Sequence, residues 1–306
     1  MDFDWKNYID NYPDLQAAGI DTQEKAIRHY NLFGKRENRK INFFNFIISG
    51  EKIQLKCDYF IGSVEDINNN PVISRQGPEK WLKHSSDVTK NQSKIFCYGH
   101  LLGTPQLMDL IKDIKYPFDI YFHNSDAVFL ESHYNELKNA NGNLKQIYAQ
   151  NNTVKEVITL PIGQANLRWE HGNTKILLSK IDENVKKSKE IFLNFSITTP
   201  KRNGLRNLLY FIQWVPNKNY SEYINTLAEY RYCICVEGNG LDTHRFWECL
   251  YLKVIPICVK NEWTEIVKEK FPMIIIDSWE SLKETSLEYN VDWEKYKDIM
   301  DLNYYI

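Results

Sequence analysis

The sequence lacks several patterns that mark common classes of enzyme. It contains no G-x-S-x-G, no P-loop, no H-E-x-x-H and no paired C-x-x-C, so the chemistry that these motifs support is not expected. Gly238 and Gly240 form a lone G-x-G, which falls short of the G-x-G-x-x-G dinucleotide fingerprint. No D-x-D follows an apolar run, and we therefore expect no bound metal.

An excess of basic charge and a long apolar run are also absent. The 38 basic and 40 acidic residues are interspersed and give a net charge of −2, which argues against a nucleic-acid partner. No apolar run approaches the ~18 residues of a membrane helix, and the acidic start Met1–Trp5 lacks the apolar region of a secretory signal. These absences predict a cytoplasmic protein with no integral membrane segment.

The cysteines do not form a recognisable disulfide or metal pattern. Cys233 and Cys235 lie two residues apart in an apolar run, so they point to the same side of one strand, where a bridge is rare. We expect reduced, buried thiols that act as small apolar side chains in a reducing compartment. The six positions are Cys57, Cys97, Cys233, Cys235, Cys249 and Cys258.

What is present is the composition of a folded globular protein. The chain is 43% hydrophobic and 25% charged, as is usual for a globular protein. Its 306 residues are enough for two domains of ordinary size. Residues 1–40 read as a small helical module, in which a break at Pro13 separates two helices and Gly34 ends the second. A lid on the larger domain is the favoured interpretation of this module, and its role stays open.

Residues 41–175 alternate short apolar runs with helical stretches, which favours a mostly parallel sheet with helices on both faces. Helices are expected over Gln106–Ile114 and Ala127–Asn139. The predicted strands are Phe43–Ile48, Asp58–Ile61, Lys94–Tyr98, Asp119–Phe122, Gln146–Ala149 and Val157–Leu160.

Residues 176–290 repeat the same alternation after the charged helical stretch Thr174–Lys189. Strands are predicted at Ile191–Phe195, Tyr232–Val236, Val254–Val259 and Met273–Ile276, and helices at Gly204–Gln213, Ser221–Tyr230 and Thr243–Leu252. Residues 291–306 are expected to form a C-terminal helix. The fold class is therefore α/β, with two Rossmann-type parallel-sheet domains facing a cleft, and ligands are expected at the carboxyl ends of the strands.

The segment from Glu237 to Glu248 carries the strongest functional signal. Its glycines follow an apolar strand, and a helix capped by Asp242 or Thr243 begins directly after them, which suits a phosphate. Arg245 in the first turn can reach a diphosphate, and Glu248 on the same helical face suits two ribose hydroxyls. A tight turn with an internal Arg245–Glu248 ion pair explains the residues about equally well.

The stretch Tyr232–Trp263 resembles the donor-binding signature of exostosin-like glycosyltransferases, which have the GT-B fold. The resemblance implies that Arg245 binds the diphosphate and Glu248 the ribose of a uridine-diphosphate sugar. More distantly, the stretch resembles the α1,3-fucosyltransferase motif, which implies a guanosine donor and places Glu237 in an acidic position. Segments at 122–126, 161–166 and 169–173 resemble exostosin-like proteins of large DNA viruses and some bacteria, so a viral protein would act in the host cytoplasm.

A second basic loop, which contains Lys201 and Arg202, follows the first strand of the C-terminal half. It lies on the same predicted edge as Glu237–Glu248 and could add phosphate contacts, although a solvated turn is the plain alternative. The expected donor-binding residues are Lys201, Arg202, Glu237, Gly238, Asn239, Gly240, Asp242, Thr243, Arg245 and Glu248.

Transfer with inversion needs a base that takes the proton of the acceptor hydroxyl. Three loops that follow strands in the N-terminal half supply candidates. Asp126 ranks first, and His100 and His171 follow, although Asp126 could instead cap a helix that begins at Ala127.

The sequence thus predicts a metal-independent, inverting glycosyltransferase with no cofactor, which binds a nucleotide-sugar donor and a glycan or other hydroxyl acceptor. A GDP-fucose-type fucosyltransferase is one alternative. A non-catalytic carbohydrate-binding protein on a transferase fold is the other, and it would not need Arg245, Glu248 and the histidines together.

Overall fold

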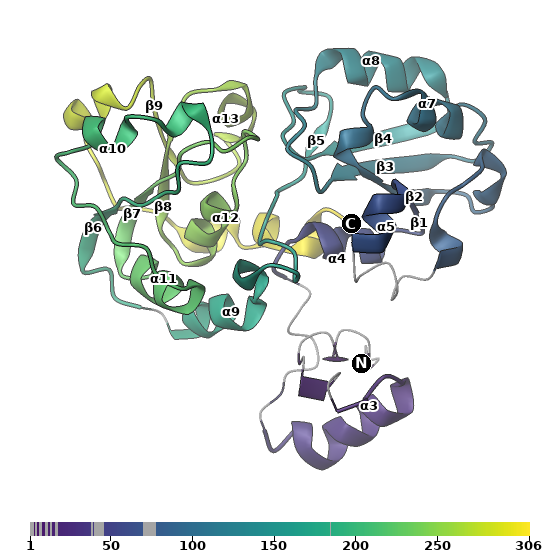
Figure 1. The fold of residues 1–306 in the computed structure, drawn as a ribbon, viewed down its shortest axis with the longest axis horizontal. Helices are drawn as coiled ribbons and strands as arrows, with labels where there is room; N and C mark the ends of the chain where they lie inside the picture. The colour runs from purple at the N-terminus through teal and green to yellow at the C-terminus, as the bar shows by residue number, and fades with distance from the viewer. Residues whose placement is uncertain are drawn as a thin grey trace.

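The computed structural model describes residues 3, 5, 8, 9, 12, 14, 15, 18–37, 39, 46–69, 78–183 and 185–306. Figure 1 shows two lobes, each built around one sheet, and an N-terminal segment outside both sheets. Asp14 of this segment forms an ion pair of 3.7 Å with Lys175. Every pairing within the two sheets is parallel, which confirms the parallel α/β class predicted from the alternation of strands and helices.

The first sheet has five strands in the order of the sequence. Its strands are β1 (Tyr59–Ile61), β2 (Ser93–Tyr98), β3 (Phe118–His123), β4 (Leu144–Ala149) and β5 (Ile158–Thr159). The second sheet has four strands, again in sequence order. They are β6 (Lys189–Phe192), β7 (Tyr230–Ile234), β8 (Ile255–Val259) and β9 (Ile274–Ile276).

In both sheets the second extended segment is added on one side of the first strand, and all later strands are added on the other side. After β1 the chain returns at Trp81 to form a parallel bridge with Phe60 before it crosses to β2 on the other side of β1. In the second sheet Trp214 makes the matching bridge to Leu193, just beyond the end of β6 and at the same spacing along the chain. Such a reversal is the topological switch point of a doubly wound sheet, where ligands bind at the carboxyl ends of the strands.

Two apolar layers enclose the first sheet because neighbouring residues of a strand face opposite sides. Ile95 of β2 packs with α7 (Pro105–Ile111) and α8 (Glu131–Ala140) on one face. Phe96 packs on the other face, which is covered by α4 (Gly50–Lys56) and by Leu302 and Tyr305 near the C-terminus. The C-terminal tail therefore closes the first lobe, although it follows the second lobe in the sequence (Figure 1).

The second sheet is enclosed in the same way. Cys233 of β7 faces the core formed with α9 (Thr174–Glu183), α11 (Tyr220–Leu227), α12 (His244–Tyr251) and α13 (Glu262–Val267). Its neighbours Tyr232 and Ile234 face the opposite core, where α10 (Leu205–Leu208) packs.

Three predicted helices differ from those observed. The first of the three begins at Glu131 instead of Ala127, because Phe129 forms a parallel bridge with Asn152 at the edge of the sheet. The helix expected over Gly204–Gln213 ends at Leu208, and the chain then returns to the sheet at Trp214. The C-terminal tail forms three 3-10 turns at Trp293–Tyr296, Asp298–Met300 and Leu302–Tyr304 instead of one helix.

The N-terminal segment contains α3 (Gln23–His29), which Thr22 caps. In the first lobe, α5 (Val64–Asn69) follows β1. Much of the predicted strand Phe43–Ile48 lies outside the described residues, and its last three residues are not in a strand. No helix among the described residues is both long enough and apolar enough to cross a membrane.

Candidate functional site

The two lobes face each other across two cavities that meet. The larger has a volume of about 630 Å³ and lies at the carboxyl ends of β6 and β7. The smaller, of about 540 Å³, lies at the carboxyl ends of β2 and β3. Asp126, Ile162 and His244 line both cavities, so the two form one continuous cleft. Hereafter we call the larger part the donor cavity and the smaller part the acceptor cavity, after the functions proposed below.

The turn before α12 holds the two lobes together. The backbone N–H of Asp242 donates to Oδ1 of Asn151 at 2.9 Å, and its Oδ2 accepts from the N–H of Ile162 at 2.7 Å. A Cβ on Gly240 would lie 2.7 Å from the Asn151 amide, so only glycine allows this approach. The close approach expected of Gly240 is therefore made to the first lobe.

The carboxylate of Asp242 consequently accepts its hydrogen bonds from the protein itself. Besides Ile162, its carboxylate accepts from Nε1 of Trp247 at 2.8 Å. Burial raises its pKa to about 7. The cap of α12 is Thr243, whose side chain makes no capping hydrogen bond. The geometry gives Asp242 a role in joining the lobes, even though it also lines the donor cavity.

Arg245 lies in the first turn of α12 and lines the donor cavity. Its Nε donates to the hydroxyl of Tyr223 at 3.2 Å, and its Nη1 donates to the carbonyl oxygen of Asn194. The guanidinium carbon lies 5.3 Å from the ring centre of Tyr223 and 5.8 Å from that of Phe192. These contacts fix the orientation of the guanidinium at the edge of the cavity.

Glu248 also lines the donor cavity, and Tyr223 links it to Arg245. The Tyr223 hydroxyl donates to Oε2 of Glu248 at 2.7 Å. Burial raises the pKa of Glu248, against the opposing effects of the Tyr223 hydroxyl and the Arg245 charge. Among the described residues no ion pair joins Arg245 directly to Glu248. The internal pair considered from the sequence is therefore replaced by a relay through a tyrosine.

Arg202 supplies a second guanidinium to the donor cavity. It donates to the carbonyl oxygens of Glu237 at 2.8 Å and Ser196 at 2.9 Å, which ties the loops after β6 and β7 together. Burial and the nearby charge of Arg245 lower its pKa. Within the described part of the chain, neither arginine has a carboxylate within 4.0 Å. Two like charges without a counterion make this edge of the cavity suited to an anion.

Two expected donor-binding residues face elsewhere. Lys201 and Glu237 form an ion pair of 2.6 Å and line a separate cavity of about 180 Å³ beside β7 and β8. Trp263 lines the same cavity, and its buried indole N–H has no partner in the described structure. Thr243 lines both this cavity and the donor cavity.

The other predicted donor residues are brought together in the donor cavity. Its lining includes Arg202, Gly238, Asn239, Gly240, Asp242, Thr243, Arg245 and Glu248.

The three predicted bases occupy different places in the cleft. Asp126 is exposed, lines both cavities and accepts from Nδ2 of Asn239 at 3.2 Å across the cleft. His171 lines the donor cavity. His100 lines the acceptor cavity, and its Nε2 lies 3.3 Å from Asp66 Oδ2. Ala127 does not begin a helix, so Asp126 is not a helix cap.

Sequence reasoning missed two residues that the cleft depends on. Tyr223 lies on α11 and meets Arg245 only in the folded chain. His244 follows the cap of α12, and its position at the start of that helix was the one local signal available.

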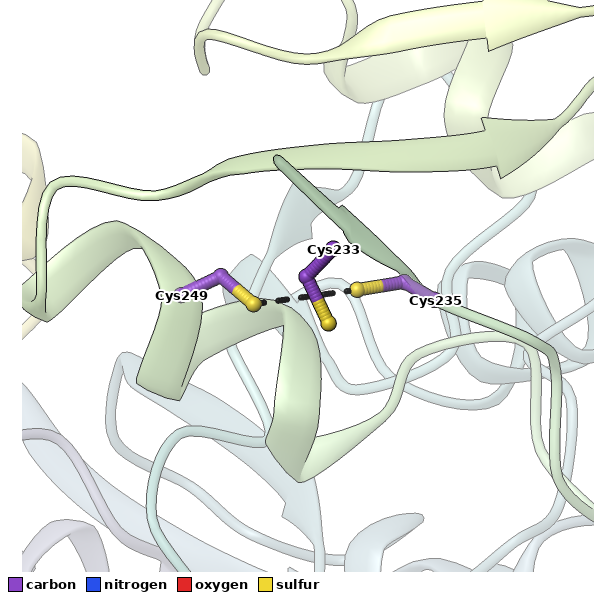
Figure 2. A group of neighbouring side chains, drawn as sticks. All are labelled: Cys233, Cys235 and Cys249. Carbon is purple, nitrogen blue, oxygen red and sulfur yellow. Dashed lines mark hydrogen bonds between the residues drawn. The ribbon is translucent and has the colours of Figure 1, made fainter. Parts of the chain in front are cut away.

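Figure 2 shows three cysteines that lie close enough together to be considered as metal ligands. The sulfurs of Cys233 on β7, of Cys235 just after this strand and of Cys249 on α12 lie within 4.8 Å of one another. All six cysteines are free and buried, as predicted. Burial raises the pKa of these three thiols, and a metal would need them as thiolates. Their surroundings are those of the apolar core.

Comparison of the chain with known protein families gives no match, and comparison with curated proteins gives none either.

Proposed function

We propose that this chain is a glycosyltransferase of the GT-B type that takes its sugar from a nucleoside-diphosphate sugar. The observation that carries the proposal is the pair of guanidiniums of Arg202 and Arg245. They face a cleft at the switch point of a parallel sheet and have no carboxylate within 4.0 Å in the described structure. A diphosphate would supply the missing negative charge.

The donor would be held by its diphosphate and its ribose. Arg202 and Arg245 would bind the diphosphate, helped by the partial positive charge at the start of α12. The two guanidiniums would then take the role that a divalent cation has in metal-dependent transferases. Tyr223 donates to Oε2 of Glu248, Tyr220 also interacts with this carboxylate, and the ribose hydroxyls would be further donors to it.

The acceptor would enter from the first lobe. The acceptor cavity is lined by Ser63, Asn124, Asn166 and other polar groups, and Trp169 at its edge is 51% exposed. Exposed aromatic rings beside hydrogen-bonding side chains suit a hydroxyl-rich sugar. The acceptor hydroxyl would meet the donor sugar where the two cavities join.

Thermal denaturation with UDP, GDP, CMP and inorganic pyrophosphate tests this proposal, with and without EDTA. A ligand at 100 times its dissociation constant adds about 2.7 kcal/mol of stability. We expect UDP or GDP to raise the melting temperature equally in the presence and absence of EDTA. A protein that none of these ligands stabilises would not be a nucleotide-sugar enzyme, and a shift that EDTA removes would rule out the metal-independent mechanism.

A further inference from the structure

His244 is held in a defined tautomer by the first lobe. Its Nδ1 lies 2.8 Å from the carbonyl oxygen of Gly163. A carbonyl oxygen can only accept a hydrogen bond, so Nδ1 carries the proton and Nε2 carries a lone pair. A Cβ on Gly163 would lie 2.1 Å from the carbonyl oxygen of Ile48, and its φ is +64°, so this carbonyl is tightly placed.

His244 lies where the two cavities join. The residue lines both, and among the described residues no hydrogen bond to Nε2 is formed. The titratable neighbours that influence it are His171, His123 and Asp126. Burial lowers the pKa of His244 to about 4, so the imidazole is neutral at neutral pH.

Asp126, His100 and His123 are less well placed for this role. The carboxylate of Asp126 accepts from Asn239 in an exposed position. His100 is directed toward Asp66 in the acceptor cavity, away from the donor cavity that it does not line. His123 is buried with both ring nitrogens bonded to the backbone, since Nε2 donates to Pro161 and Nδ1 accepts from Asn124.

We propose that His244 is the catalytic base of the transfer, an inference that rests on the proposed function. Its Nε2 accepts the proton of the acceptor hydroxyl while the hydroxyl oxygen forms a bond to the anomeric carbon. The bond from that carbon to the diphosphate oxygen breaks, and its electron pair leaves with the nucleoside diphosphate. Arg245, the next residue, faces the charge that develops on the leaving group.

His244 and Arg245 are adjacent in the first turn of α12, and both line the donor cavity. One receives the positive charge of the proton, and the other neutralises the negative charge of the leaving group. The imidazolium that forms is stabilised by the diphosphate anion beside it. The base would therefore come from the same helix as the diphosphate site, although the first lobe orients it through Gly163.

The test replaces His244 with asparagine, whose side-chain N–H can keep the bond to Gly163 while the basic nitrogen is lost. Release of nucleoside diphosphate from UDP-glucose, UDP-N-acetylglucosamine and GDP-fucose is measured, with water as the acceptor. We expect His244→Asn to reduce the release at least 100-fold, within the range for loss of a general base. The melting-temperature shift by UDP or GDP should stay unchanged. The matched control is His84→Asn, at an exposed histidine that lines neither cavity.

A second measurement does not depend on turnover. Nitrogen-15 NMR of the imidazoles, with the His244 signal assigned by its loss in His244→Asn, should show the Nδ1–H tautomer and a change at Nε2 when UDP or GDP is added. An Nε2–H tautomer, or release by His244→Asn at the wild-type rate, would overturn the assignment. If nucleotides stabilise the wild type while either result is found, only the base is wrong; if no nucleotide binds, the proposed function itself is wrong.

Discussion

The carboxyl edges of the two sheets share a strand order but carry different side chains. In the first lobe this edge presents carboxylates and imidazoles, among them Asp66, His100 and Asp126. In the second it presents the guanidiniums of Arg202 and Arg245. The same bridge opens both sheets, at Trp81 and at Trp214. The backbone therefore sets where a ligand can lie, and the side chains decide which ligand it is.

The contacts between the edges are also unequal. The segment of the second lobe from Asn239 to Arg245 reaches across the cleft and contacts Asp126, Asn151 and Gly163 of the first. Tyr220 and Tyr251 make further contacts with the first lobe outside this segment. A change in this segment can therefore alter both halves of the cleft, whereas a change at the far side of either cavity should alter only one.

The largest effect on ligand affinity is expected for Arg245→Ala. Loss of a charge-assisted contact to a diphosphate costs about 1.5–3 kcal/mol per hydrogen bond, so affinity for UDP or GDP should fall about 100-fold or more. Isothermal titration calorimetry measures this directly. Arg206→Ala is the matched control, because Arg206 stacks on Trp214 outside the cleft and its loss should leave the affinity unchanged.

If Arg245→Ala binds UDP or GDP with wild-type affinity, the edge of the cavity that carries Arg202 and Arg245 does not bind the donor. A variant that fails to fold would instead give Arg245 a structural role through Tyr223 and Asn194. Arg245→Lys separates these outcomes, because it keeps the charge but loses the fork that reaches both partners.

Asp242→Asn tests the buried carboxylate that joins the two lobes. A buried acid whose pKa rises from 3.8 to about 7 contributes stability below pH 3.8 that is lost as the pH rises through 7. At about 1.4 kcal/mol per pKa unit, the loss is on the order of 4 kcal/mol. The asparagine cannot ionise, so the difference in unfolding free energy between variant and wild type should shift in the variant's favour from pH 4.5 to pH 8. Urea denaturation at both pH values measures it, and an unchanged difference would contradict the burial of an ionising carboxylate.

The sequence was informative where the pattern is local. Short apolar runs between helical stretches predicted the strands of both sheets, and the spacing of Arg245 and Glu248 predicted that both face one cavity. Contacts between distant segments could not be predicted this way. Tyr223 joins those two residues from another helix, and Asn151 explains Gly240 from the other lobe. Trp81 and Trp214 each add a single bridge, which is too short for any alternating pattern.

A smaller effect is expected for Glu248→Gln. The amide keeps an oxygen that can accept from Tyr223, so the fold should be preserved. Loss of a charged acceptor for the ribose costs about 1–2 kcal/mol, which is roughly a tenfold weaker affinity for UDP or GDP. Affinity for inorganic pyrophosphate, which has no ribose, should rise or stay the same because the negative charge is gone. Equal weakening for both ligands would show that Glu248 acts only through Arg245.

Asp126→Asn should have the smallest effect, and it decides which lobe supplies the base. Asp126 is exposed, and the asparagine oxygen can still accept from Asn239, so unfolding free energy should change by less than about 0.5 kcal/mol. If His244 takes the proton, release of nucleoside diphosphate should fall less than tenfold in Asp126→Asn, by the loss of a charge near the imidazole. A 100-fold fall at unchanged nucleotide affinity would return the base to the first lobe. The two lobes would then differ in function, with one lobe binding the donor and the other activating the acceptor.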